Sequence, residues 1–143
     1  MRERTEHYVI RYVVFGEDIK VKGELLTVVI HTLLKDEIEL IRNGVCPYCK
    51  TKFKKIYNHL RSKTTPCSHS FTYTVSEVIK TYTNLLTNIV RGKDTYTLIT
   101  PNQKIHFKEK KELINHIRQH PEILNTIKEN PNRKTKKEIQ HLV

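Results

Sequence analysis

Tryptophan and alanine are absent from the 143-residue chain, and glycine occurs only four times. So few glycines leave little material for a loop that cradles nucleotide phosphates, and no His-Glu-x-x-His or Gly-x-Ser-x-Gly motif is present. No apolar run approaches the ~18 residues that span a bilayer, and the first residues show no signal-peptide pattern. We therefore expect a cytoplasmic protein without enzymatic activity and without a membrane partner.

Acidic residues are also scarce. The chain has 15 Asp and Glu against 26 Lys and Arg, which gives a formal net charge of +11. Residues 1–45 carry seven basic and eight acidic side chains, residues 46–103 carry nine and two, and residues 104–143 carry ten and five. Such an excess favours a polyanionic partner, of which nucleic acid is the commonest, although charge alone also serves solubility. The pattern predicts that a nucleic acid contacts the middle and the end of the chain.

The apolar pattern of the N-terminal third predicts a hairpin followed by a helix. Residues 7–15 are rich in aromatic and β-branched side chains, and Gly16-Glu-Asp18 separates them from residues 19–22, which is typical of a β-hairpin. Apolar residues then recur every three or four positions from 24 to 42, which predicts a long helix ending at Gly44.

The second half predicts a similar mixture of elements. Thr74-x-x-Glu77 has capping-box spacing and begins an apolar stripe that ends at Gly92, which predicts a second long helix. A second hairpin is expected over residues 95–108, followed by short helices. The fold class is therefore a small single α+β domain with two long helices, two β-hairpins and an inserted zinc knuckle. Its expected parts are residues 1–45, the zinc finger 46–70, residues 71–130, and a basic tail 131–143.

The cysteine content is odd, which argues against a disulfide framework. Two of the three cysteines form Cys46-Pro-Tyr-Cys49, and His59 and Cys67 follow after nine and seven residues. Zn²⁺ prefers four thiolate or imidazole donors in a tetrahedron, and a Cys-x-x-Cys turn supplies two of them. The spacing predicts a structural zinc site of Cys46, Cys49, His59 and Cys67, with His69 as the alternative fourth ligand.

The stretch Cys46-Pro-x-Cys49-x-x-x-Phe53-x-x-Ile56-x-x-His59-Leu60 resembles the short-spacer prokaryotic zinc finger of the Ros/MucR type and related fingers of archaeal viruses. The resemblance covers only residues 46–69. It implies a ββα zinc unit of DNA-binding transcriptional regulators, with Cys46, Cys49 and His59 at the first three ligand positions. The chain departs from the family where a second histidine is expected, so Cys67 or His69 must complete the site.

Three other interpretations of the sequence remain. In the simplest, the cysteines and the histidine are ordinary residues that bind no metal. Cys-Pro-Tyr-Cys is also the active-site tetrapeptide of glutaredoxins, but those proteins place it after a strand, whereas here a predicted helix precedes it. Asp18, Lys20 and Glu24 faintly resemble the pattern of metal-dependent nucleases, which acidic residues near lysines often do by chance.

The residues after Cys49 are strongly basic. A helix over residues 53–62 would place Lys54, Asn58 and Arg61 on its solvent face, where Arg reads guanine and Asn reads adenine in a major groove. The alternative is that this face is only a solvated charged surface. For Tyr57, Tyr73 and Tyr96 there are also two alternatives: stacking on the bases of a single strand, or packing within the protein. The candidate nucleic-acid-binding residues are Lys50, Lys52, Lys54, Lys55, Asn58, Arg61 and Lys63.

The leading functional prediction is a zinc-containing protein that binds nucleic acid, DNA rather than RNA, as a regulator of transcription. A second prediction, from a different class, is a zinc-stabilised protein-interaction module that docks on an acidic protein partner such as a host transcription machine. The two differ in salt dependence, because each phosphate contact steepens the slope of affinity against salt by about 0.9 on duplex DNA.

Overall fold

The computed structural model describes the backbone of residues 2–17 and 20–127, and the side chains of residues 5–17 and 25–127. This part of the chain contains seven helices and one three-stranded antiparallel sheet. The α+β class is therefore confirmed. The predicted basic tail, residues 131–143, lies outside the described residues, as does Asp18 of the nuclease-like pattern.

The N-terminus is helical, so the predicted N-terminal hairpin is wrong. Helix α1 covers Arg2–Phe15 and helix α2 covers Lys20–Leu33. Val9 and Val13 are both fully buried, and their spacing of four residues places them on one face of a helix. The β-branched and aromatic residues of this stretch favour a strand locally. Burial of one face of the helix in the core outweighs that preference.

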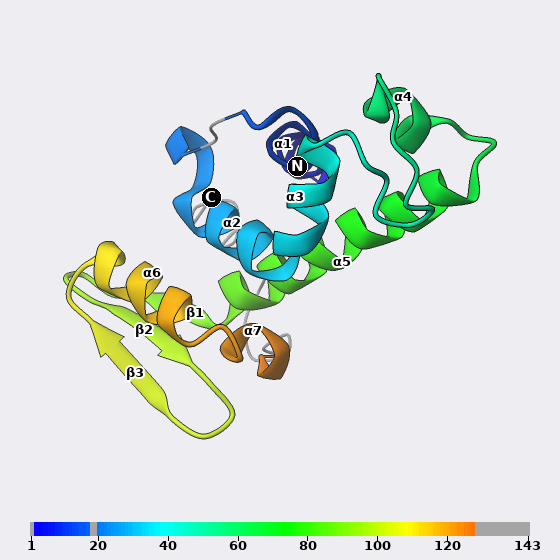
Figure 1. Cartoon of the computed structure of the whole chain (residues 1–143). Helices are drawn as coiled ribbons and strands as arrows, with labels where there is room; N and C mark the ends of the chain where they lie inside the picture. The colour runs from blue at the N-terminus through cyan, green and yellow to red at the C-terminus, as the bar shows by residue number, and fades with distance from the viewer. Residues whose placement is uncertain (1, 18–19, 128–143) are drawn as a thin grey trace.

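The single helix predicted over residues 24–42 is divided in two. Leu34, with φ of −120° and ψ of 25°, separates α2 from helix α3, Lys35–Arg42. The Leu34 side chain is buried, and α3 packs against α1 through a face that includes Ile38 and Ile41. The change of direction at Leu34 therefore carries the chain across α1 and toward the cysteines (Figure 1).

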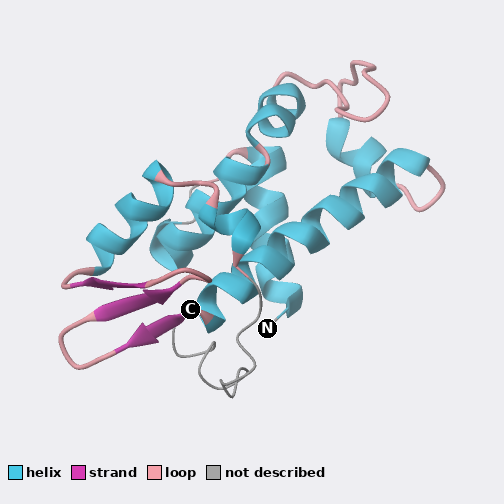
Figure 2. Cartoon of the chain, turned by 90° about the horizontal axis from the view of Figure 1, so that it is seen from below, coloured by secondary structure: helices cyan, strands magenta, loops and turns pink. Residues whose placement is uncertain are grey.

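Helix α5, Pro66–Thr87, is the longest element and joins the two ends of the molecule (Figures 1 and 2). The hydroxyl of Thr65 accepts a hydrogen bond from Ser68 N, and Pro66 occupies the first helical turn, which is a favourable helix start. The predicted start at Thr74 is therefore wrong. The Thr74 hydroxyl lies inside α5 and donates to Ser70 O.

The sheet lies at the C-terminal end of α5. Strands β2, Tyr96–Ile99, and β3, Lys104–Phe107, pair where the sequence predicts the second hairpin. A third strand, β1, Ile89–Arg91, pairs with β2 in the region that the sequence assigned to the end of a helix. Helix α6, Lys110–Gln119, packs on β2 and β3, and the short helix α7, Ile123–Thr126, contacts α5.

One apolar core connects these layers. The sheet contributes the buried residues Ile89, Leu98 and Phe107, and α6 contributes a stripe that includes Leu113 and Ile117. The core continues along α5 to the cysteine-containing segment, where Cys46 and Cys67 are themselves buried. Over the described residues, each helix is either too short or too polar to traverse a lipid bilayer.

Candidate metal centre

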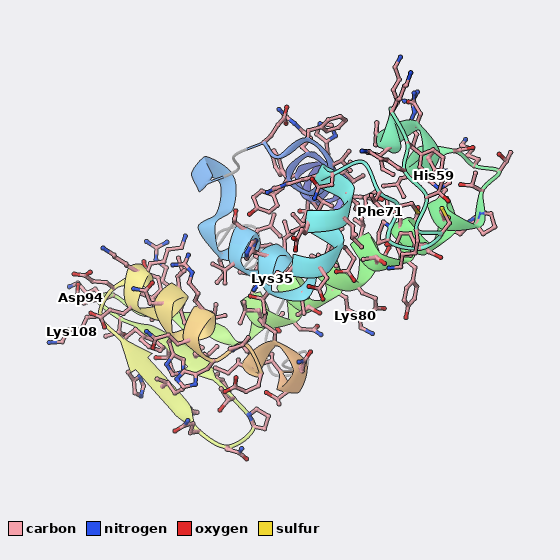
Figure 3. The ribbon with its side chains drawn as sticks, viewed as in Figure 1. Lys35, His59, Phe71, Lys80, Asp94 and Lys108 are labelled. Carbon is pink, nitrogen blue, oxygen red and sulfur yellow. The ribbon has the colours of Figure 1, made fainter. Side chains whose placement is uncertain are left out.

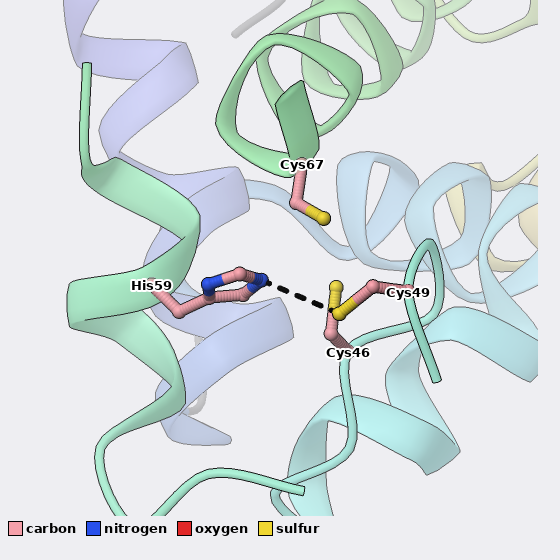
Figure 4. A group of neighbouring side chains, drawn as sticks. All are labelled: Cys46, Cys49, His59 and Cys67. Atoms are coloured by element: carbon pink, nitrogen blue, oxygen red, sulfur yellow. Dashed lines mark hydrogen bonds between the residues drawn. The ribbon is translucent and has the colours of Figure 1, made fainter. Parts of the chain in front are cut away.

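Cys46, Cys49, His59 and Cys67 come together at the end of α5 that lies opposite the sheet (Figures 1 and 4). The three sulfur atoms and one ring nitrogen all lie within 4.8 Å of one another. Cys49 Sγ is 3.6 Å from His59 Nε2. In a tetrahedron with Zn–S bonds of ~2.3 Å and Zn–N bonds of ~2.0–2.1 Å, sulfur and nitrogen lie ~3.6 Å apart. This cysteine–histidine cluster is therefore close enough to hold a metal ion.

A tight turn presents the first two cysteines. Lys50 N donates to Cys46 O at 2.8 Å, and Cys46 N donates to Thr51 O at 3.0 Å. Lys50 has a positive φ of 60°, which a non-glycine residue adopts at some cost in energy. The turn therefore holds Cys46 and Cys49 on the same side of the loop (Figure 4).

Gly44 is required at the base of this turn. Its φ is +78°, a conformation that other residues disfavour, and Phe53 N donates to its carbonyl at 2.8 Å. A Cβ at this position would lie 2.9 Å from the backbone oxygen of Phe53. The glycine that the sequence marked as a helix stop thus also allows the chain to close back on itself around the cysteines.

The short helix α4, Ile56–Arg61, supplies the histidine. Leu60, which follows His59, is only 1% exposed and anchors α4 in the core, so that α4 packs on α5. The Phe53 ring stacks on the His59 ring with a centroid distance of 4.0 Å and an interplanar angle of 17°. Thr65 Oγ1 donates to His59 O at 3.1 Å. These contacts fix the imidazole so that Nε2 faces the sulfur atoms (Figure 4).

The fourth donor comes from the first turn of α5. Cys67 is the second residue of this 22-residue helix and lies beside the other three donors. The N-terminus of a helix carries a partial positive charge that stabilises a nearby thiolate. His69 is exposed and is not among the clustered donors, so of the two alternatives the structure brings Cys67 to the site. A bound ion would tie the turn, α4 and α5 together.

The thiols of Cys49 and Cys67 differ in acidity in the protein without metal. Hydrogen bonding by the side chain and backbone of Thr51 lowers the pKa of Cys49 to about 6. Burial, together with the neighbouring thiols of Cys46 and Cys49, raises the pKa of Cys67 to about 11. Metal ions bind the thiolate form, so metal binding at neutral pH must release the Cys67 proton, and affinity must rise with pH.

One contact that sequence reasoning missed fastens the turn to α5. The Tyr48 hydroxyl, in the middle of Cys-Pro-Tyr-Cys, donates to Thr74 Oγ1 at 2.9 Å. Nothing in the sequence pairs these two positions, which are 26 residues apart. The contact of Phe53 was missed as well: its ring lies on the His59 ring. The apolar spacing of Phe53, Ile56 and Leu60 was the available signal in the sequence.

The candidate nucleic-acid-binding residues are all on the surface. Helix α4 begins at Ile56, so Lys54 precedes the helix, and only Asn58 and Arg61 of the predicted reading face belong to it. The Arg61 guanidinium lies over the Tyr57 ring, 5.4 Å from its centroid. The exposed candidates are Lys50, Lys52, Lys54, Lys55, Asn58, Arg61 and Lys63.

The geometry thus defines an α+β protein with a Cys3His cluster at one end of its longest helix. Comparisons of the chain with known protein families, with curated proteins and with solved structures found no match. The functional assignment therefore depends on the residues themselves.

Proposed function

We propose that the cysteine–histidine cluster is a structural zinc site. Three thiolates and one imidazole are the donor set that zinc prefers, and softer thiolate ligands disfavour magnesium, calcium and manganese. Four protein donors fill a tetrahedron and leave no position for a substrate or a reactive water, whereas catalytic zinc sites keep one position open. We therefore assign zinc a role in folding and no part in catalysis.

We further propose that the zinc-held segment binds DNA, as a regulator of transcription. The supporting observation is its charge: residues 50–63 contain six Lys and Arg and no Asp or Glu, and each of these cations is exposed. Binding a polyanion releases condensed counterions, which is the main source of affinity for such a surface. We call residues 50–63 the basic segment.

The basic segment is suited to contacts with phosphates more than to extensive base reading. Helix α4 has six residues and rises only ~9 Å, so that few of its side chains can reach base edges at once. Asn58 is the exposed amide on α4, and the lysines lie in the loops around it. A fixed backbone keeps these cations in one arrangement, which lowers the entropic cost of binding.

The test is the salt dependence of binding to duplex DNA. The slope of log affinity against log salt should be negative, and Lys54→Gln should reduce its magnitude by about 1. Lys80→Gln is the matched control, because Lys80 is an exposed lysine in the second half of α5, away from His59 (Figure 3). Fluorescence anisotropy of labelled duplex measures both.

An affinity for duplex that is absent, or that does not change with salt, would contradict DNA binding and would favour the protein-interaction module. Equal effects of Lys54→Gln and Lys80→Gln would contradict the assignment to the basic segment. One equivalent of zinc in each variant is required before the slopes are compared.

A further inference from the structure

A group of aromatic rings and arginines lies beside the basic segment and has no part in the cysteine–histidine cluster. Phe15, the last residue of α1, is a large apolar side chain that is 56% exposed. Its ring meets that of Tyr57 edge-to-face, with centroids 5.1 Å apart. The Arg61 guanidinium lies over the Tyr57 ring, 5.4 Å from its centroid.

A second arginine borders the same end of α1. The Arg42 guanidinium lies 5.1 Å from the Tyr12 ring centroid and donates to Tyr12 O at 2.9 Å. A Cβ built on Gly16, the neighbour of Phe15, would be 3.7 Å from Arg42 Nε. We call Tyr12, Phe15, Arg42, Tyr57 and Arg61 the aromatic–arginine surface.

The cations of this surface are available to an anion. Among the described residues, neither Arg42 nor Arg61 takes part in an ion pair, and both are exposed. The nearby carboxylate of Glu17 is paired with Arg11. Arginine laid on an aromatic ring can still donate its remaining N–H groups to phosphate oxygens, and the partly exposed ring of Phe15 offers an apolar contact.

We infer that the aromatic–arginine surface binds single-stranded nucleic acid, with an unpaired base stacked on Phe15 and the adjoining phosphates at Arg61 and Arg42. Aromatic rings interleaved with cations are the features that bind single strands with little sequence preference, because every base has a flat π-face. A base-paired duplex keeps its bases stacked on one another and cannot use Phe15 in this way. This inference rests on the proposed nucleic-acid binding and specifies where an unpaired strand is held.

The chain offers a direct optical test, because it contains no tryptophan. Phe15→Trp introduces a single indole at the stacking position. Titration with short oligothymidylate should quench the indole fluorescence, since stacking on a base brings the two rings into contact. Tyr73→Trp is the matched control: Tyr73, on α5, is 68% exposed, but among the described residues no arginine or second ring lies against it, so its indole should not be quenched.

Affinity measurements give an independent readout. Phe15→Ala should weaken binding of oligothymidylate about tenfold and leave binding of the oligothymidylate–oligoadenylate duplex unchanged, with no effect of Tyr73→Ala on either probe. An unchanged affinity of Phe15→Ala for the single strand, or equal quenching at positions 15 and 73, would overturn the inference while leaving duplex binding intact. Equal weakening of both probes would also overturn it. If the parent protein bound neither the single strand nor the duplex, the proposed function would be contradicted as well.

Discussion

Cys67→Ser is expected to abolish zinc binding, whereas His69→Ala is expected to retain one equivalent per chain. Cys67 Sγ belongs to the group of donors within 4.8 Å of one another, and His69 is exposed outside it. Zinc contributes ~10–16 kcal/mol to the folding of isolated zinc-finger peptides, so the loss of one ligand removes most of the stabilisation of this segment. The measurement is metal analysis of both variants after identical purification.

The consequence of Cys67→Ser should be local. The cysteine-containing segment, residues 46–65, contributes only Cys46 and Leu60 to the buried apolar core, whereas the remainder of that core comes from outside this segment. Amide hydrogen exchange should accelerate across residues 46–65 and change little in the sheet. Zinc retained by Cys67→Ser and lost by His69→Ala would show that the fourth ligand has been assigned to the wrong residue.

Leu60→Ala is expected to lower the free energy of unfolding by about 2–5 kcal/mol, the usual cost of removing a large buried aliphatic side chain. Leu60 is 1% exposed and is the one fully buried residue of α4. The variant should still bind one equivalent of zinc, because no donor atom is changed. Urea unfolding of the zinc-loaded protein measures the difference.

Ile56→Ala is the matched control on the same helix, because Ile56 is only partly buried and its truncation opens a smaller cavity. The cost should therefore be clearly smaller than that of Leu60→Ala. A cost below ~1 kcal/mol for Leu60→Ala would mean that α4 is held by metal alone. Comparable costs at both positions would contradict the role of Leu60 as the anchor.

The donors of the candidate site could be predicted from the sequence because zinc imposes a narrow choice of residue types. Cys46, Cys49 and His59 stand at spacings that such sites use, and the structure brings them together with Cys67. Spacing alone leaves Cys67 and His69 open as the fourth donor. The start of α5 at Pro66 brings Cys67 into the cluster and leaves His69 outside it.

The supporting contacts could not be predicted, since they join positions that have no local relation. Tyr48 reaches Thr74 across 26 residues, and Phe53 lies on His59 only because the loop between them folds back. The N-terminal hairpin was mispredicted for a related reason. Residues 7–15 favour a strand by composition, but Val9 and Val13 are buried by tertiary packing of a helix against α3 and α5.

X-ray absorption at the zinc edge, on protein purified without added metal, tests most directly whether zinc organises the segment between Cys46 and Cys67. One zinc per chain, with three sulfur neighbours at ~2.3 Å and one nitrogen neighbour at ~2.0–2.1 Å, is the expected result. Protein that contains no zinc, or zinc without three sulfur neighbours, would contradict it.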